Sequence, residues 1–124
     1  MRFLSTRTHG VIDYLTGILF LAAPWLFGFA DGTAAQWVPV VVGACIILSA
    51  LLTDFELGLV HLIPMPVHLG LDILVGLLLA ASPWLFGFSD RVWMPHLILG
   101  LAEVLVSLVT RTVPGTDSRV PSRV

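Results

Sequence analysis

The decapeptide AAPWLFGFAD at residues 22–31 returns as ASPWLFGFSD at residues 81–90. When the alignment is extended toward the N-terminus, residues 9–31 pair with residues 68–90, and 13 of these 23 positions are identical. A block of this length, written twice in one short chain, indicates an internal repeat. Each copy is predicted to be a helix, a short turn and a second helix.

The similarity continues more weakly into the second helix of each copy. The further matching pairs are Trp37 with Trp93, Pro39 with Pro95, and Gly43 with Gly100. Two helices per copy is an even number, so both copies would enter a membrane with the same orientation. They are then parallel repeats, and we expect them to superpose by a rotation of about 180° around the membrane normal.

The composition indicates that lipid is the solvent for most of this chain. It is 57% hydrophobic and 11% charged, whereas soluble domains carry about 25% charged residues. A helix needs about 20 residues to cross a bilayer, so the second and fourth of the predicted spans are slightly short. The fold class predicted is an all-α, four-helix transmembrane bundle with spans at residues 8–27, 36–52, 66–86 and 92–109.

The charges predict orientation and exclude one class of partner. The chain has a net charge of −2 and no lysine, so it lacks the basic surface that nucleic acids require. Five of its six arginines fall on the side of both termini, and only Arg91 falls in a turn on the other side. The positive-inside rule then predicts a multi-pass protein of the cell membrane with both termini cytoplasmic.

The second copy contains the tripeptide Ser82-Pro83-Trp84, and the first copy has alanine at the position of the serine. In this motif the chain resembles the SPW repeat family of small integral membrane proteins. The resemblance implies two membrane helices per repeat and carries no established activity. The expected segments are a cytoplasmic flank (1–8), repeat 1 (9–54), an interfacial connection (55–65), repeat 2 (66–111) and a disordered cytoplasmic tail (112–124).

The repeated motif has mainly a structural interpretation. The tryptophans would anchor the helices at the outer interface, the glycines suit the left-handed position that ends a helix, and the prolines should kink the helices. An alternative is that the carbonyls freed by the prolines, those of Phe20 and Leu79, serve a ligand. The motif residues are Pro24, Trp25, Gly28, Pro83, Trp84 and Gly87.

A second repeated pattern is His-x3-Asp-x3-Gly, whose four-residue steps place each set on one helix face near the inner boundary. One interpretation is that each histidine hydrogen-bonds its own aspartate, while the glycines let the first and third helices approach closely. Another brings the pairs together as a two-His, two-Asp cluster that suits a divalent transition metal. The residues are His9, Asp13 and Gly17, and His68, Asp72 and Gly76.

Either interpretation requires that His9 lies within hydrogen-bonding reach of Asp13 or Asp72, and that His68 does likewise. A haem held between the two histidines fits poorly, since it needs a wide gap. No cofactor is therefore expected.

Glu103 lies near the middle of the fourth predicted span, where a charged group is costly and marks a candidate functional site. Its counterpart in the first repeat is Ile46. Glu103 shares one stripe with His96, Gly100 and Ser107, and this stripe must face the bundle interior or a subunit interface. Glu103 could be a structural hydrogen-bond donor or a relay for protons or cations toward Asp13 and Asp72.

These features predict a non-enzymatic structural or interaction protein that contacts the lipid bilayer and could form a homo-oligomer. Enzymatic motifs such as a nucleophile elbow or a phosphate-binding loop are absent from the sequence. Two alternatives stay open. One is a small oligomeric transporter or proton pathway that uses Glu103, Asp13 and Asp72. The other is a metal-binding membrane component that uses His9, Asp13, His68 and Asp72.

Overall fold

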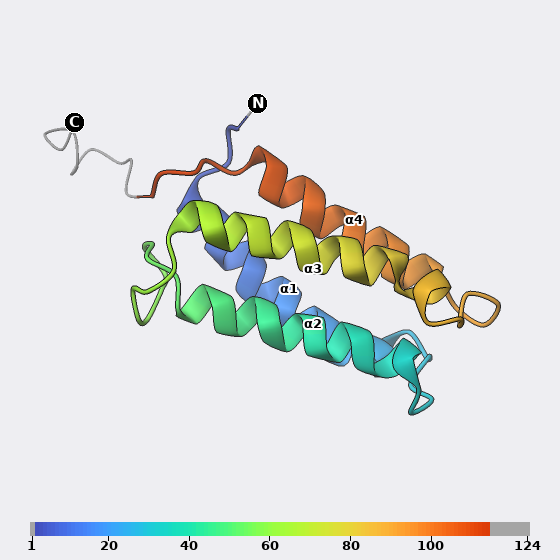
Figure 1. Cartoon of the computed structure of the whole chain (residues 1–124). Helices are drawn as coiled ribbons and strands as arrows, with labels where there is room; N and C mark the ends of the chain where they lie inside the picture. Colours follow the sequence, from blue (N-terminus) through green and yellow to red (C-terminus); the bar gives the residue numbers. More distant parts are fainter. Residues whose placement is uncertain (1, 115–124) are drawn as a thin grey trace, which may run out of the picture.

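A computed structural model describes residues 2–114, which form four α-helices (Figure 1). These are α1 (Thr6–Leu26), α2 (Ala34–Leu51), α3 (Met65–Leu85) and α4 (Met94–Val109). The helices begin and end close to the limits of the predicted spans, so the all-α bundle is confirmed. The tail predicted to be disordered falls outside the described residues from position 115 onward.

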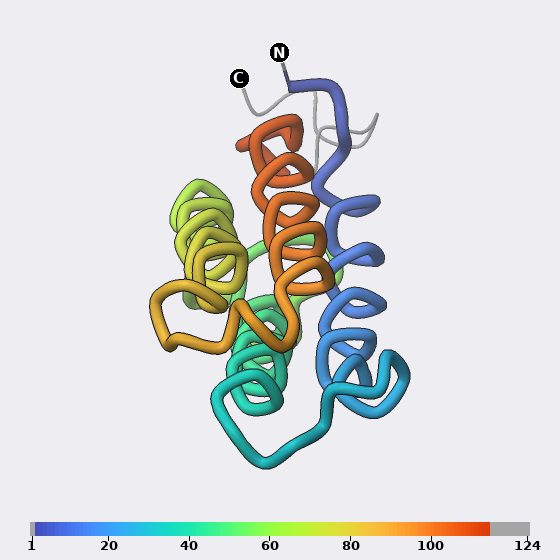
Figure 2. The backbone as a smooth tube through the Cα atoms, turned by 90° about the vertical axis from the view of Figure 1, so that its right-hand side faces the viewer, coloured from blue at the N-terminus to red at the C-terminus, as the bar shows by residue number. Residues whose placement is uncertain are grey.

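The four helices occupy the corners of a bundle, with α1 and α3 at opposite corners (Figure 2). The start of α1, the end of α4 and the connection between α2 and α3 lie at one end of the bundle, and the two short turns lie at the other (Figure 1). Helices of the same repeat pack most closely, α1 against α2 and α3 against α4. This arrangement places the N-terminal ends of α1 and α3 at the same end of the bundle.

The bundle is apolar outside and partly polar inside. Leu15 and its repeat mate Leu74 are each 64% exposed, while nearly as many polar as apolar side chains are buried among the described residues. Three helices, α1, α2 and α3, are long and apolar enough to cross a membrane, and α4 is shorter at 16 residues. Apolar faces directed outward around polar buried groups are what a helix bundle in lipid requires.

The glycines of the repeat do not bring α1 to α3, as one interpretation of the sequence expected. A Cβ atom on Gly43 would lie 2.7 Å from the carbonyl oxygen of Gly17, and one on Gly100 would lie 2.5 Å from that of Gly76. The glycines therefore join α1 to α2 and α3 to α4, inside each repeat. That expectation was wrong because pattern spacing shows which face a glycine is on, but not which helix meets that face.

The two copies of the decapeptide end their helices in the same way. Gly28 and Gly87 both adopt φ 73°, the left-handed conformation predicted for them. Beyond each glycine the backbone N–H of Phe29 or Phe88 donates to the carbonyl of the proline five residues earlier, at 2.8 Å in both repeats. This 6→1 hydrogen bond defines the Schellman motif that closes a helix C-terminus.

The serine of the Ser-Pro-Trp motif has a local role in the second repeat. Pro83 has no N–H, so the carbonyl of Leu79 loses its helical donor. The Ser82 hydroxyl donates to this carbonyl at 2.7 Å. Ser82 is fully buried. Its hydroxyl already donates to the Leu79 carbonyl, one of the two carbonyls that the sequence suggested could serve a ligand.

The outer end carries the four tryptophans and a polar link between the two turns. All four indoles are exposed, from 42% for Trp93 to 60% for Trp25, as an interfacial belt requires. Arg91 of the second turn lies 3.4 Å from the Asp31 carboxylate and donates to the Thr33 hydroxyl at 3.1 Å. Hydrogen bonds from the side chain and backbone of Thr33 hold the pKa of Asp31 below its ordinary value.

The inner end is closed by two matching backbone bridges. Leu4, just before α1, pairs with Thr110 after α4, and Ile63, just before α3, pairs with Thr53 after α2. In the connection between the repeats, residues 55–65, Phe55 turns inward and packs with Met65 and Leu69. Each repeat thus begins where the second helix of the other repeat ends.

Candidate functional site

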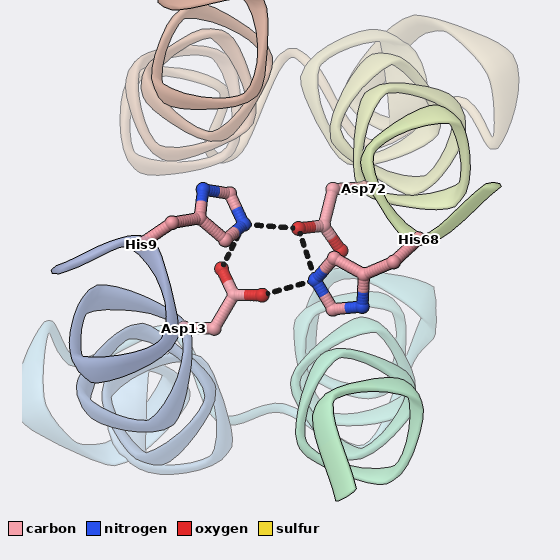
Figure 3. A group of neighbouring side chains, drawn as sticks. All are labelled: His9, Asp13, His68 and Asp72. Carbon is pink, nitrogen blue, oxygen red and sulfur yellow. Dashed lines mark hydrogen bonds and ion pairs between the residues drawn. The ribbon is translucent and has the colours of Figure 1, made fainter. Parts of the chain in front are cut away.

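Four ionisable side chains meet inside the bundle, toward its inner end (Figure 3). His9 and Asp13 come from α1, and His68 and Asp72 come from α3. All four are at most 1% exposed. Because α1 and α3 occupy opposite corners, these side chains fill the centre between the two repeats.

The four side chains form a ring in which histidines and aspartates alternate, with Asp13 contributing both of its oxygens and Asp72 only one (Figure 3). Its hydrogen bonds run between repeats: His9 Nε2 to Asp72 Oδ2 at 2.9 Å, and His68 Nε2 to Asp13 Oδ2 at 2.7 Å. Each Nε2 also lies 3.1 Å from the aspartate of its own helix. The expected His–Asp proximity is confirmed, but the hydrogen bonds do not join each histidine to its own aspartate. The i,i+4 interpretation was wrong on this point.

Two threonines that the sequence analysis missed determine which ring nitrogen carries hydrogen. Thr110 accepts from His9 Nδ1 at 2.8 Å while its hydroxyl donates to the carbonyl of Val106 at 2.6 Å. Thr53 accepts from His68 Nδ1 at 2.8 Å while its hydroxyl donates to the carbonyl of Ser49. Since each hydroxyl has one hydrogen and uses it on a carbonyl, both Nδ1 atoms must be donors.

This tautomer has a direct consequence for the centre of the ring. A neutral histidine that carries hydrogen on Nδ1 has a lone pair on Nε2, and here that lone pair faces two carboxylates. Two protons can be shared between the Nε2 atoms and the carboxylates, or one divalent cation can sit among the four groups. Both have the same total charge.

The polar stripe of α4 faces the interior, as predicted, since His96, Glu103 and Ser107 are all buried. Glu103 lies against α3, because a Cβ atom on Gly76 would lie 3.3 Å from its own Cβ atom. Within the described part of the chain, three buried oxygens have no hydrogen-bond partner: Asp13 Oδ1, Glu103 Oε2 and Ser107 Oγ. Two of these oxygens belong to the interior face of α4.

His96, at the outer end of the same stripe, is held apart from the ring. Its Nε2 donates to the carbonyl of Ala35 at 2.8 Å. Its imidazole packs between the rings of Phe29 and Phe88, with centroid distances of 4.8 and 4.9 Å. The hydrogen bond from His96 to Ala35 thus links the start of α4 to the start of α2.

A further residue missed from the sequence is Arg2, which covers the inner end of α4. Its Nη1 donates to the carbonyls of Ser107 and Thr110, at 3.0 and 2.6 Å. A cation is favourable at a helix C-terminus, where carbonyls lack helical donors. Extending the repeat alignment past the helix ends would have matched Thr53 with Thr110, but no sequence signal assigned Arg2 to α4.

A hollow of about 270 Å³ at the inner end is lined by Arg2 and residues 111–113, and two apolar grooves lie near the outer end. One, of about 240 Å³, is lined by Phe27 and the start of α4. Its counterpart, also of about 240 Å³, is lined by Phe86 and the start of α2. None of these three linings contains an imidazole or a carboxylate, so the polar centre is the candidate site.

The profile of the SPW repeat domain matches residues 7–110. The chain therefore belongs to the SPW repeat family, and with its apolar helices it is a membrane protein. No curated protein and no solved structure matches the chain.

Proposed function

We propose that this protein is a non-enzymatic membrane protein whose two repeats are held together by a divalent transition-metal ion at the centre of the bundle. The observation that supports this most strongly is the hydrogen-bond direction at Thr53 and Thr110. It leaves both histidine Nε2 atoms directed at aspartate oxygens, and imidazole and carboxylate are common ligands of such ions.

The spacing of the candidate ligand atoms suits one ion. One atom from each of His9, Asp13, His68 and Asp72 can be chosen so that all four lie within 4.8 Å of one another. The threonines act as the outer partners that metal-binding histidines usually have, since a hydrogen bond on one ring nitrogen orients the other toward the ion. A single ion would also neutralise the two aspartates.

The structural role is supported by burial and by connectivity. The ligand side chains are at most 1% exposed, so a substrate has no direct approach to them from solvent. The ring joins α1 to α3, which pack less closely than the helices within each repeat. An ion shared by the two repeats would stabilise a contact that is looser than the packing within each repeat.

Metal content and metal-dependent stability test this proposal. Protein purified in mild detergent, stripped with chelator and reloaded with zinc is expected to retain one ion per chain and to unfold at a higher temperature than the stripped form. A variant with both H9Q and H68Q should retain none. His61→Gln is the matched control, because His61 is exposed and pairs with Asp54 outside the ring. Wild-type protein that neither retains metal nor gains stability from it would overturn the proposal.

A proton or cation pathway is the second candidate. It is favoured by the buried stripe on α4, where His96 Nδ1, Glu103 Oε2 and Ser107 Oγ have no hydrogen-bond partner in the described residues. Such a pathway would need a homo-oligomer, because four short helices rarely enclose a channel. Proton flux into proteoliposomes that E103Q abolishes would support this candidate, and equal flux with and without Glu103 would exclude it.

The orientation completes the proposal: the protein lies in the cell membrane with both termini in the cytoplasm. It is supported by the distribution of arginines. The start of α1 and the end of α4 lie at one end of the bundle, and Arg2 and Arg7 belong to the first of these segments, whereas the turn that contains Arg91 lies at the other end (Figure 1). In a variant that lacks Cys45, a cysteine at Ala30 should react with an impermeant reagent on intact cells, and one at Val113 should not. The reverse labelling would contradict this orientation.

A further inference from the structure

The inner end of the bundle is closed twice by the same backbone pattern. After α4 the backbone N–H of Arg111 donates to the carbonyl of Leu4 at 2.8 Å, and after α2 the N–H of Asp54 donates to the carbonyl of Ile63 at the same distance. Both bridges are parallel. Arg111 and Asp54 therefore occupy equivalent positions in the two repeats.

The side chains on these two bridges differ. His61, two residues before the bridged Ile63, places its Nδ1 atom 2.8 Å from Oδ1 of Asp54. In the other bridge the same two positions hold Arg2 and Arg111. Two guanidinium groups are both permanently positive and cannot pair with each other. The same backbone thus carries a mutually paired His and Asp in one repeat and two cations in the other.

The two arginines line one hollow. Within residues 2–114 its lining consists of Arg2, Arg111, Thr112 and Val113, and its volume is about 270 Å³. Arg2 is held in place because its Nη1 donates to two carbonyls at the C-terminus of α4, at 3.0 and 2.6 Å. Two arginines in one lining that contains no carboxylate have the composition of an anion site.

The carboxylates described at this end have other partners. Asp54 pairs with His61, Glu56 accepts from the hydroxyl of Thr6 at 2.7 Å, and the two aspartates of the ring bind its histidines. Residues 115–124 contain two arginines and one aspartate, so they bring no excess of negative side chains. The expected counter-charge for the two arginines is therefore an anion that binds to the protein.

We propose that Arg2 and Arg111 form a binding site for one phosphate group, carried by an anionic phospholipid at the inner interface or by a soluble phosphate. The planar guanidinium suits this anion because it donates two parallel hydrogen bonds to phosphate oxygens. A lipid is favoured by Phe3 and Val113, which stand beside the arginines and are each 61% exposed. Basic pockets of membrane proteins at this depth bind lipid headgroups. The site needs no metal ion, so it does not depend on the function proposed for the ring.

The experiment is native mass spectrometry of delipidated protein in mild detergent, titrated with phosphatidylglycerol. Parallel titrations use diacylglycerol, which lacks the phosphate, and inorganic phosphate, which lacks the lipid. Wild-type protein should bind one phosphatidylglycerol per chain and no diacylglycerol. R111Q should bind phosphatidylglycerol about 10–100-fold more weakly, because it loses charge-assisted hydrogen bonds.

Arg7 supplies the matched control, since it is exposed near the start of α1 and does not line the hollow. R7Q removes the same charge from the same end and should weaken phosphatidylglycerol binding by at most about fivefold, the effect of one surface cation. A variant with both R2H and R111D carries the side chains that the other repeat has on the same backbone. It should remain folded, as thermal unfolding would show, and should lose the bound lipid.

The three titrations distinguish the sources of the phosphate. Binding of phosphatidylglycerol alone assigns the site to a lipid, and binding of inorganic phosphate alone assigns it to a soluble phosphate; either result, lost in R111Q, supports the site. Equal weakening by R111Q and R7Q would show a general attraction of charge and would overturn it. Equal binding of diacylglycerol and phosphatidylglycerol, or no binding of any of the three by folded wild-type protein, would also overturn it.

Discussion

In the first repeat α2 turns Ile46 and Ala50 toward the interior, whereas in the second repeat α4 turns Glu103 and Ser107 toward it. All four side chains are almost completely buried. The two helices otherwise correspond closely, since each has a glycine contact with its partner helix and a terminal threonine on a histidine. These two pairs of equivalent positions are thus apolar in the first repeat and polar in the second.

This difference separates contacts that build the bundle from contacts that add chemistry to it. The features present in both repeats are the ring, the threonines, the glycine contacts, the backbone bridges and the closed helix ends. Each of them joins helices or satisfies buried polar groups. Glu103 and Ser107 have no polar equivalent in the first repeat, and one oxygen of each has no hydrogen-bond partner in the structure described.

The largest expected effect comes from removing one carboxylate of the ring. Asp13→Leu and Asp72→Leu should each lower the free energy of unfolding by about 3–5 kcal/mol, because each removes one of the two carboxylates that the two buried imidazoles share. Asp→Asn at either position should be milder, since the amide oxygen still accepts a hydrogen bond. Reversible unfolding in mixed detergent micelles measures these changes. Equal stability for Asn and Leu would show that the carboxylates are not structural.

The glycine contacts should be equally sensitive in both repeats. Gly43→Ala and Gly100→Ala would place a methyl group against the backbone of the partner helix, and each should cost about 2–3 kcal/mol. Gly70→Ala is the control, because a Cβ there meets no atom within 4 Å. The same unfolding assay applies. A loss in only one repeat would show that α1–α2 and α3–α4 packing are not equivalent.

Removing the threonine acceptors tests the assigned tautomer. Thr53→Val and Thr110→Val keep the shape of the side chain but leave a histidine Nδ1–H without an acceptor, at an expected cost of about 1–2 kcal/mol each. Nitrogen NMR of the imidazoles should show hydrogen on Nδ1 in the wild type. An Nδ1 without hydrogen in the wild type would contradict the assignment and, with it, the main support for a metal ion.

The smallest expected effect concerns the one difference within the decapeptide that is buried in both repeats, Ala23 against Ser82. Ser82→Ala should destabilise the protein by about 0.5–1 kcal/mol, because the Leu79 carbonyl loses its donor. Ala23→Ser should stabilise it by a similar amount if the new hydroxyl reaches the carbonyl of Phe20. Thermal unfolding of both variants measures the pair. A loss of stability from Ala23→Ser would show that the first repeat has no room for the motif serine.

Much of the fold was predictable because the signals are local. Gly28 and Gly87 predicted helix ends, and both adopt the left-handed conformation there. The repeat predicted four helices and a matching pair of His–Asp sets, and both are present. The site was predicted in its residues but not in its contacts. Hydrogen bonds that cross from α1 to α3 depend on how each helix is rotated about its axis, which no spacing within one helix encodes.

The sequence by itself determined the number of helices, their ends, the two-fold repetition and the residues that must be buried. These follow from chain-local geometry and from the requirement of a membrane that apolar faces point outward. Only the tertiary structure decided that the glycines join helices within a repeat, that each histidine bonds the aspartate of the other repeat, and that Thr53 and Thr110 orient the imidazoles. The reason is that these contacts join residues 15 to 101 positions apart, and their geometry exists only once all four helices are packed.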